Sequence, residues 1–435
     1  MFYSKLLDKL LKSKLFKNSA IYTITNVLNK SIPFLLIPIL TRYLSTESYG
    51  IIAMFTVLVG FVGPFTGLSI HGAVQLKYYK KEETDFPVYL TNSLLVLICS
   101  TTITSIFIYL FANQIESLSG FPKTWFWSIV LFSFFQFIYF VLLFIWQAKQ
   151  SAFNYGIYQI LTTILNFGLS LLLVIPIGNY NGFDWQGRIL GQVISMILSG
   201  LVALYIIYKY NFIKFKFNKQ YIRDALRIGL PMIPHAFGAI VVTMVDRFFI
   251  TNIKGLHETG IYTLGFQIGM IIMLIQDAFN MAYVPYLFEK LKKGDENDKI
   301  RLVKFTYLYF LAIIIIVFIF SYIVSLVFPY FVGEKFTNSL PFVFWIALGF
   351  AFNGMYKMVV NYIFYIEKTY LIAVVTFSTA IVNVILCYFL INHFGTIGAA
   401  YSSCISWFVC FLLAWSFSAK VYPMPWLYFL RKTNV

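Results

Sequence analysis

Ionisable residues lie inside long apolar stretches of this 435-residue chain, where their chemistry would be the recognition of ions. They are four cations and two carboxylates: Lys30, Arg42, Arg247 and Lys357 against Asp246 and Asp277. Ammonium and guanidinium groups bind anions, and the planar guanidinium can donate two hydrogen bonds to one phosphate. The excess of positive charge predicts an anionic ligand. Asp246 and Asp277 are then the candidates for binding a coupling proton or sodium ion.

Uncharged polar residues accompany these charges at helical spacing. The residues expected to line a cleft with them are Thr23, Asn26, His71, His235, Gln276, Asn280 and Asn353. His71 is expected to continue a stripe of glycines, Gly60 to Gly67, along one helix. Each histidine can also be read as a hydrogen-bonded structural group, which is the commoner role.

Partners for the charges are harder to assign from sequence. Asp246 and Arg247 are adjacent and point about 100° apart on a helix, so we expect them to pair with other helices rather than with each other. Arg247 then either contacts an anionic ligand or pairs with an acid such as Asp277 or Glu116. Few buried carboxylates are available for Lys30 and Lys357.

Enzyme motifs are missing from the sequence. It contains no Gly-rich phosphate loop ending in Lys-Ser/Thr, no HExxH and no GxSxG. The four cysteines lie inside apolar runs without metal-ligand spacing, which favours a packing role: Cys99, Cys387, Cys404 and Cys410. We therefore expect a protein that is not an enzyme and holds no metal or cofactor.

Composition indicates where these residues must reside. Apolar residues make up 60% of the chain and charged residues only 11%, whereas a soluble protein carries about a quarter charged residues. Such a chain cannot cover itself with polar groups, so a packed soluble enzyme is excluded. The formal charge of +16 is better explained by membrane orientation than by nucleic-acid binding.

Twelve stretches are long enough to cross the hydrocarbon core as helices. They are residues 19–41, 50–72, 88–112, 125–146, 154–177, 187–208, 228–251, 259–284, 303–328, 340–363, 369–391 and 396–419. Runs such as 311–320 lack the alternation of a membrane β-strand. The predicted fold is an all-α polytopic membrane protein.

Lys and Arg alternate between the two sides of these spans. One side carries 25 of them and the other six, which predicts that both termini are in the cytoplasm.

The spans divide into two similar halves. We expect an interfacial amphipathic segment at 1–18, a six-helix bundle at 19–208, a cytoplasmic linker at 209–227, a second six-helix bundle at 228–420 and a tail at 421–435. The order of motifs is the same in both halves, which predicts a parallel repeat with a central cleft between the bundles.

Two segments carry a resemblance to a known family. Residues 26–51 (NVLNKSIPFLLIPILTRYLSTESYGI), with Asp246-Arg247-Phe248-Phe249-Ile250 and Gly260-Ile261-Tyr262, resemble bacterial flippases for O-antigen and capsule repeat units, which belong to the multidrug/oligosaccharidyl-lipid/polysaccharide exporter superfamily. The resemblance implies that undecaprenyl-pyrophosphate-linked oligosaccharide moves from the inner to the outer leaflet by alternating access, with its head in a cationic lumen.

The implied partners are this lipid-linked sugar, the bilayer, a coupling H+ or Na+ and a polysaccharide polymerase, with no nucleic acid. Arg42, Asp246 and Arg247 match the family's motifs, while Lys30, Asp277 and Lys357 rest on the spacing argument.

Two other functions in the same superfamily remain as alternatives. A lipid II flippase tends to carry two further spans, which are absent here. A multidrug or cation antiporter would be expected to have acidic residues within the first six spans, and the sequence has none there. A third alternative, a membrane scaffold that transports nothing, would not need buried lysines.

The asymmetry of basic residues predicts the outcome of reporter fusions. Fusions after residues 85, 215 and 295 should report a cytoplasmic location, and fusions after 118, 182 and 335 a periplasmic one. Alkaline phosphatase and a fluorescent protein serve as paired reporters because each is active on one side only. One inverted fusion would show that the span count is wrong at that point.

Overall fold

The computed structural model describes residues 14–175 and 184–427. Side chains are not described for residues 14–20, 22–24, 26, 30, 32, 33 and 235. Residues 1–13 of the predicted interfacial segment at 1–18 therefore lie outside the described part of the chain, and residues 14–18 belong to the first described helix.

The described residues form helices joined by short loops, and none of them is in a strand. The helices are α2 (Lys14–Tyr43), α3 (Thr46–Val62), η1 (Thr66–Ser69), α4 (His71–Tyr79), α5 (Phe86–Leu110), α6 (Ala112–Ser119), η2 (Lys123–Trp125), α7 (Phe126–Ala148), α8 (Ala152–Val174), α10 (Trp185–Lys209), α11 (Lys219–Gly229), α12 (Met232–Lys254), α13 (Leu256–Gly269), α14 (Ile271–Lys293), α15 (Glu296–Phe331), η3 (Glu334–Ser339), α16 (Leu340–Tyr365), α17 (Tyr370–Phe394) and α18 (Ile397–Val421). The all-α prediction is confirmed.

Most of these helices can span a membrane. Within the described residues, ten helical segments are long and apolar enough, or eleven if one bent pair is a single span. The predicted first span, 19–41, falls on α2. The protein is therefore a multi-pass membrane protein, and the count is consistent with the twelve predicted spans.

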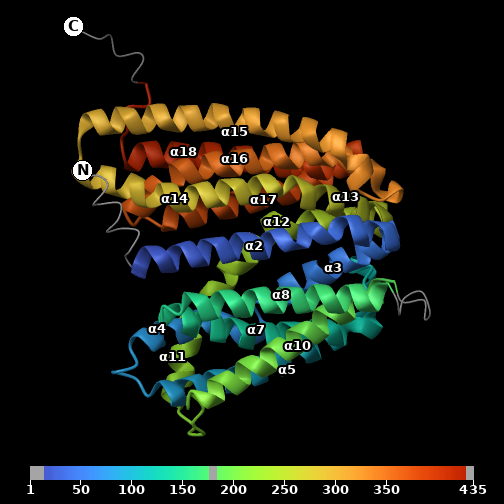
Figure 1. The fold of residues 1–435 in the computed structure, drawn as a ribbon, viewed down its shortest axis with the longest axis vertical. Coiled ribbons are helices and arrows are strands. Elements are labelled where there is room, and N and C mark those ends of the chain that lie inside the picture. Colours follow the sequence, from blue (N-terminus) through green and yellow to red (C-terminus); the bar gives the residue numbers. More distant parts are fainter. Residues whose placement is uncertain (1–13, 176–183, 428–435) are drawn as a thin grey trace. The chain divides into compact units, whose positions relative to one another are not determined.

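The chain divides into two compact units (Figure 1). Unit 1 comprises Met1–Ile240 with Gly255–His257, and unit 2 comprises Val241–Lys254 with Glu258–Val435.

Unit 1 is built on α7, α8 and α10. Helix α10 packs against both α7 and α8, and α2 packs on α8 (Figure 1). Buried Leu90, Val141 and Ile207 belong to its apolar core. Within a membrane, the exclusion of water does not drive apolar helices together. Close packing of their side chains must therefore hold them in place.

The predicted linker, 209–227, packs onto unit 1. Asn92 donates from Nδ2 to the carbonyl oxygen of Lys216 at 2.8 Å. Asp224 on α11 accepts a hydrogen bond from Tyr89 at 3.1 Å and pairs with Lys77 at 3.1 Å. These contacts fix α11 against α4 and α5.

The second predicted span, 50–72, is broken rather than continuous. Helix α3 and the segment Thr66–Tyr79 meet at 61°, and Gly67, Leu68 and Ser69 have φ of +74°, +50° and +54°. Ser100 on α5 accepts a hydrogen bond from the Gly67 amide at 2.9 Å. The expected stripe from Gly60 to His71 is therefore wrong, because the left-handed residues turn the chain between them.

Unit 2 is centred on α16. This helix packs against α14, α15 and α18, and α17 packs on α18 (Figure 1). Buried Phe350, Val359 and Phe411 belong to the core. Helix α14 begins only after Gly269 and Met270, so the predicted eighth span, 259–284, consists of two helices, α13 and α14.

Gly67→Ala should destabilise the protein because Gly67 has both a left-handed backbone and no room for a methyl group. A Cβ there would overlap the ring of Phe137. The left-handed cost is about 1–2 kcal/mol and overpacking adds about 1–3 kcal/mol. The midpoint of thermal unfolding in detergent should fall.

Gly72→Ala is the matched control, since Gly72 lies in α4 and a Cβ there meets nothing within 4 Å. Its midpoint should be unchanged or slightly higher. Equal midpoints for the two variants would contradict the importance of the break.

Candidate functional site

A polar face joins α14 to α16 within unit 2. It comprises Gln276, Asp277 and Asn280 on α14 and Asn353, Lys357 and Asn361 on α16. The three α16 residues recur at four-residue steps, so they lie along one helix face, as the spacing predicts. We call these six residues the α14–α16 polar face.

Lys357 and Asp277 form an ion pair at the middle of this face. Lys357 Nζ donates to Asp277 Oδ1, and the two side chains keep 22% and 25% of their surface exposed. The sequence analysis expected few carboxylates for Lys357, yet Asp277 is its partner. The correction follows from packing, because α14 and α16 face each other over this stretch.

Amide groups flank the ion pair on both sides. Gln276 donates from Nε2 to Asn353 Oδ1 at 2.8 Å and to the carbonyl oxygen of Phe350 at 3.0 Å. Asn361 donates to Asn280 Oδ1 at 3.0 Å. Gln276 Oε1 is buried and has no hydrogen-bond partner in the described part of the chain. The amides hold α14 and α16 in register, so the charges between them are fixed in place.

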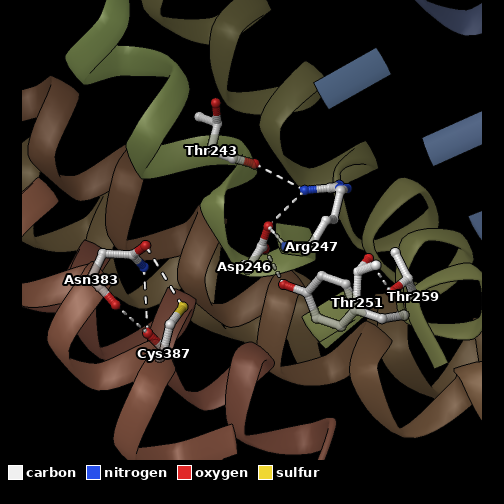
Figure 2. A network of polar contacts seen from close by, with 9 residues as sticks. Thr243, Asp246, Arg247, Thr251, Thr259, Asn383 and Cys387 are labelled. Atoms are coloured by element: carbon white, nitrogen blue, oxygen red, sulfur yellow. Dashed lines mark hydrogen bonds and ion pairs between the residues drawn. The ribbon is translucent and has the colours of Figure 1, made fainter. Parts of the chain in front are cut away.

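A second ion pair lies on α12 (Figure 2). Arg247 Nη1 donates to Asp246 Oδ1 at 2.9 Å and to the carbonyl oxygen of Thr243 at 3.0 Å. Tyr262 of α13 donates its hydroxyl to the other carboxylate oxygen of Asp246. The guanidinium carbon lies 4.1 Å from the centre of the Phe266 ring. This pair is closed, since only 9% of the Arg247 side chain and 3% of the Asp246 side chain are exposed.

The expectation that Asp246 and Arg247 pair with other helices is therefore wrong. Their Cβ atoms diverge, but the long Arg247 side chain folds back over the preceding turn to reach Asp246 and Thr243. Neither Asp277 nor Glu116 is its partner, because Asp277 pairs with Lys357 and Glu116 with Lys123. A role for Arg247 in recognising an anion stays a prediction.

Smaller polar contacts surround this pair. Thr251 and Thr259 lie 2.8 Å apart between their hydroxyl oxygens, and the thiol of Cys387 lies 3.9 Å from Asn383 Oδ1 (Figure 2). Asn383 also donates to Ser406 of α18 at 3.2 Å. These contacts tie α12 to α13 and α17 to α18.

The other predicted residues belong to unit 1. His71 begins α4 in unit 1 and stacks on Phe144, with 5.5 Å between ring centroids and 8° between planes. Arg42 is an exposed residue in the last turn of α2. The side chains of Lys30, Thr23, Asn26 and His235 lie outside the described residues.

Two functional groups were missed by the sequence analysis. Tyr262 belongs to a motif that carries the family resemblance, but its sequence position does not indicate a contact with Asp246. Arg188 lies at the start of the predicted span 187–208, yet it is half-buried on α10 and contacts Asn166 and Ser170 of α8. The spacing of Asn166 and Ser170, one turn apart, was the available signal.

Metal ligands do not gather in the described part of the chain, where no three His, Cys, Asp or Glu side chains could hold an ion together. The structure offers instead two ion pairs within membrane helices, of which Asp246–Arg247 is closed and Asp277–Lys357 is accessible.

Curated proteins are similar to this chain over most of its length. A curated membrane protein of Haemophilus influenzae, described as uncharacterized, is 29% identical over 367 residues, which are 82% of this chain and 85% of that protein. A Shigella flexneri protein named "Putative O-antigen transporter" is 23% identical over 437 residues, covering 95% of this chain and 97% of its own.

Solved structures show the same fold. The lipid II flippase MurJ in an inward closed conformation has a TM-score of 0.73 at 16% identity, covering 92% of this chain and 87% of that chain. An inward-facing multidrug resistance transporter of the MATE family, in the MOP superfamily, has a TM-score of 0.68 at 14% identity, covering 93% and 96%.

The model of the family described as "Polysaccharide biosynthesis protein" matches residues 15–291, more than half of the chain. Together with the fold, this match confirms the resemblance found in the sequence: the chain belongs to the polysaccharide biosynthesis protein family.

Proposed function

We propose that the chain moves undecaprenyl-pyrophosphate-linked oligosaccharide repeat units from the inner to the outer leaflet of the bacterial cytoplasmic membrane by alternating access, for surface polysaccharide assembly. The family match and the likeness to a protein named as an O-antigen transporter support this cargo. In this proposal the chain is a carrier and not an enzyme, and both of its termini are in the cytoplasm.

The accessible ion pair between Lys357 and Asp277 carries the proposal. A charged pair inside a membrane helix is costly, and an apolar pair of similar size is often as stable or more stable. Its presence is therefore better explained by function than by stability. The pair remains about a quarter exposed, so a ligand can reach it.

An anionic head group can compete with Asp277 for the Lys357 ammonium. Binding of a pyrophosphate oxygen to Lys357 would release the Asp277 carboxylate from its partner. A carboxylate without a cation in a membrane favours taking up a proton or a sodium ion. We propose that this exchange of partners couples the cargo to H+ or Na+.

The closed pair has a different role in this account. Asp246 receives hydrogen bonds from Arg247 and from the buried hydroxyl of Tyr262, which leaves little of its carboxylate accessible. We propose that it anchors α12 to α13 while the accessible pair binds the cargo.

The double variant Lys357→Met/Asp277→Leu separates function from stability. We expect the protein to accumulate normally in the membrane, because both charges are removed together. Surface glycan should fall about tenfold or more, since a hydrogen bond to a charged group contributes about 1.5–3 kcal/mol. The measurement compares surface glycan with folded protein in a strain that depends on this chain.

The matched control is Glu289→Gln/Lys293→Gln, which removes an exposed ion pair from the end of the same helix. Its glycan output should equal that of the wild type. Normal output from a well-folded Lys357→Met/Asp277→Leu variant would contradict the proposed role of the pair.

A further inference from the structure

Arg188 is a cation in an unfavourable place. It lies in the first turn of α10 (Trp185–Lys209), a candidate membrane span. The amino end of a helix carries partial positive charge, which repels a cation. A cation in a membrane helix is costly as well unless an anion compensates it.

No carboxylate compensates Arg188 in the described part of the chain. None of the ion pairs found there includes it. The neighbouring segment 176–183, which is not described, contains no Asp or Glu in its sequence. The charge therefore lacks the partner that Arg247 and Lys357 both have.

Two neutral groups hold one end of the guanidinium. Arg188 Nη1 donates to Asn166 Oδ1 at 2.7 Å and to Ser170 Oγ at 2.5 Å. Ser170 in turn donates to the carbonyl oxygen of Asn166 at 2.6 Å. The described residues supply no acceptor to Nη2 or Nε, and the side chain remains partly accessible. Two of its donor nitrogens therefore have no acceptor among the described residues.

Close packing fixes this arrangement. A Cβ on Gly191 would lie 2.6 Å from Ser170 Oγ, and a Cβ on Gly187 would lie 2.8 Å from the carbonyl oxygen of Leu173. These two glycines let the backbone of α10 approach α8. This close approach brings Ser170 and Asn166 within hydrogen-bond distance of Arg188. Donors that are held before a ligand arrives lose less entropy when it binds.

We propose that Arg188, held by Asn166 and Ser170, is a binding site in unit 1 for a phosphoryl group of the lipid-linked cargo. Nη2 and Nε can donate to two oxygens of one phosphate, a geometry that an ammonium cannot offer. The amino end of α10 adds attraction for the same anion. This inference rests on the proposed function and adds a second anion site, distant in sequence from Lys357.

Asp184 is the competing explanation for Arg188. It precedes Arg188 by one helical turn, and its Oδ2 accepts hydrogen bonds from Ser48 of α3 and from Ser45, which immediately precedes that helix. If its carboxylate served as the counter-ion of Arg188, removal of either charge would have the same effect. The test therefore includes Asp184→Asn.

The test measures binding of farnesyl pyrophosphate, a short prenyl pyrophosphate, to the full chain in detergent. We expect Arg188→Gln to weaken binding about tenfold or more, the loss of a charged hydrogen bond. Arg188→Lys and Ser170→Ala should weaken it less. Arg223→Gln, which removes an exposed arginine of α11, should bind as the wild type does. Farnesol, which lacks the anion, should bind all variants alike and so reports a folded protein.

Several results would overturn the inference. Equal affinity of wild type and Arg188→Gln for farnesyl pyrophosphate would do so, as would an equal loss in Asp184→Asn. Equal competition by a short-chain phosphatidylglycerol, or by inorganic phosphate, would overturn the assignment to the cargo. Failure of the wild type itself to bind farnesyl pyrophosphate would instead count against the proposed function.

Discussion

The free-energy cost of an uncompensated charge in hydrocarbon constrains each charged side chain inside the membrane helices of this protein. Unit 2 meets the constraint in two ways. Asp246 and Arg247 are almost fully enclosed, with Tyr262 and Phe266 completing their contacts. Lys357 and Asp277 satisfy each other but stay accessible. An ion pair is thus enclosed in one place and accessible in the other, and the difference is set by how much protein surrounds it.

Close approach of helices determines which charges can meet. Gly265 packs so near η3 that a Cβ would lie 2.7 Å from the carbonyl oxygen of Ser339, and Gly354 packs equally near the hydroxyl of Tyr309. In a bilayer, such small residues replace the water-driven burial that stabilises soluble cores. The amides of the α14–α16 polar face then add direction to this packing. Together they hold Lys357 opposite Asp277 rather than in lipid.

Regular spacing was the part of this architecture that the sequence could predict. The helical spans follow from apolar length, and the alignment of Asn353 and Lys357 follows from four-residue steps on one straight helix. The break at Gly67 was missed because apolar length alone cannot distinguish a bent span from a straight one. Gly63-Pro64 and Gly67 were the local signals for it.

Pairing of side chains was much harder to predict. Arg247 reaches Asp246 only because its side chain bends back along α12, a rotamer that spacing does not determine. Asp277 and Lys357 are 80 residues apart, so their contact depends on how α14 packs on α16. The contacts of Arg188 do not follow from spacing either, because Asn166 and Ser170 lie on another helix.

Transbilayer movement of a defined cargo tests the central claim most directly. The purified chain would be reconstituted into vesicles with a fluorescent prenyl-pyrophosphate-linked sugar, and an impermeant quencher would report how fast the label reaches the outer leaflet. The account predicts movement well above that of protein-free vesicles, and none above background for the same sugar on a prenyl chain without the pyrophosphate. Equal rates with and without protein, or equal movement of the neutral lipid, would contradict it.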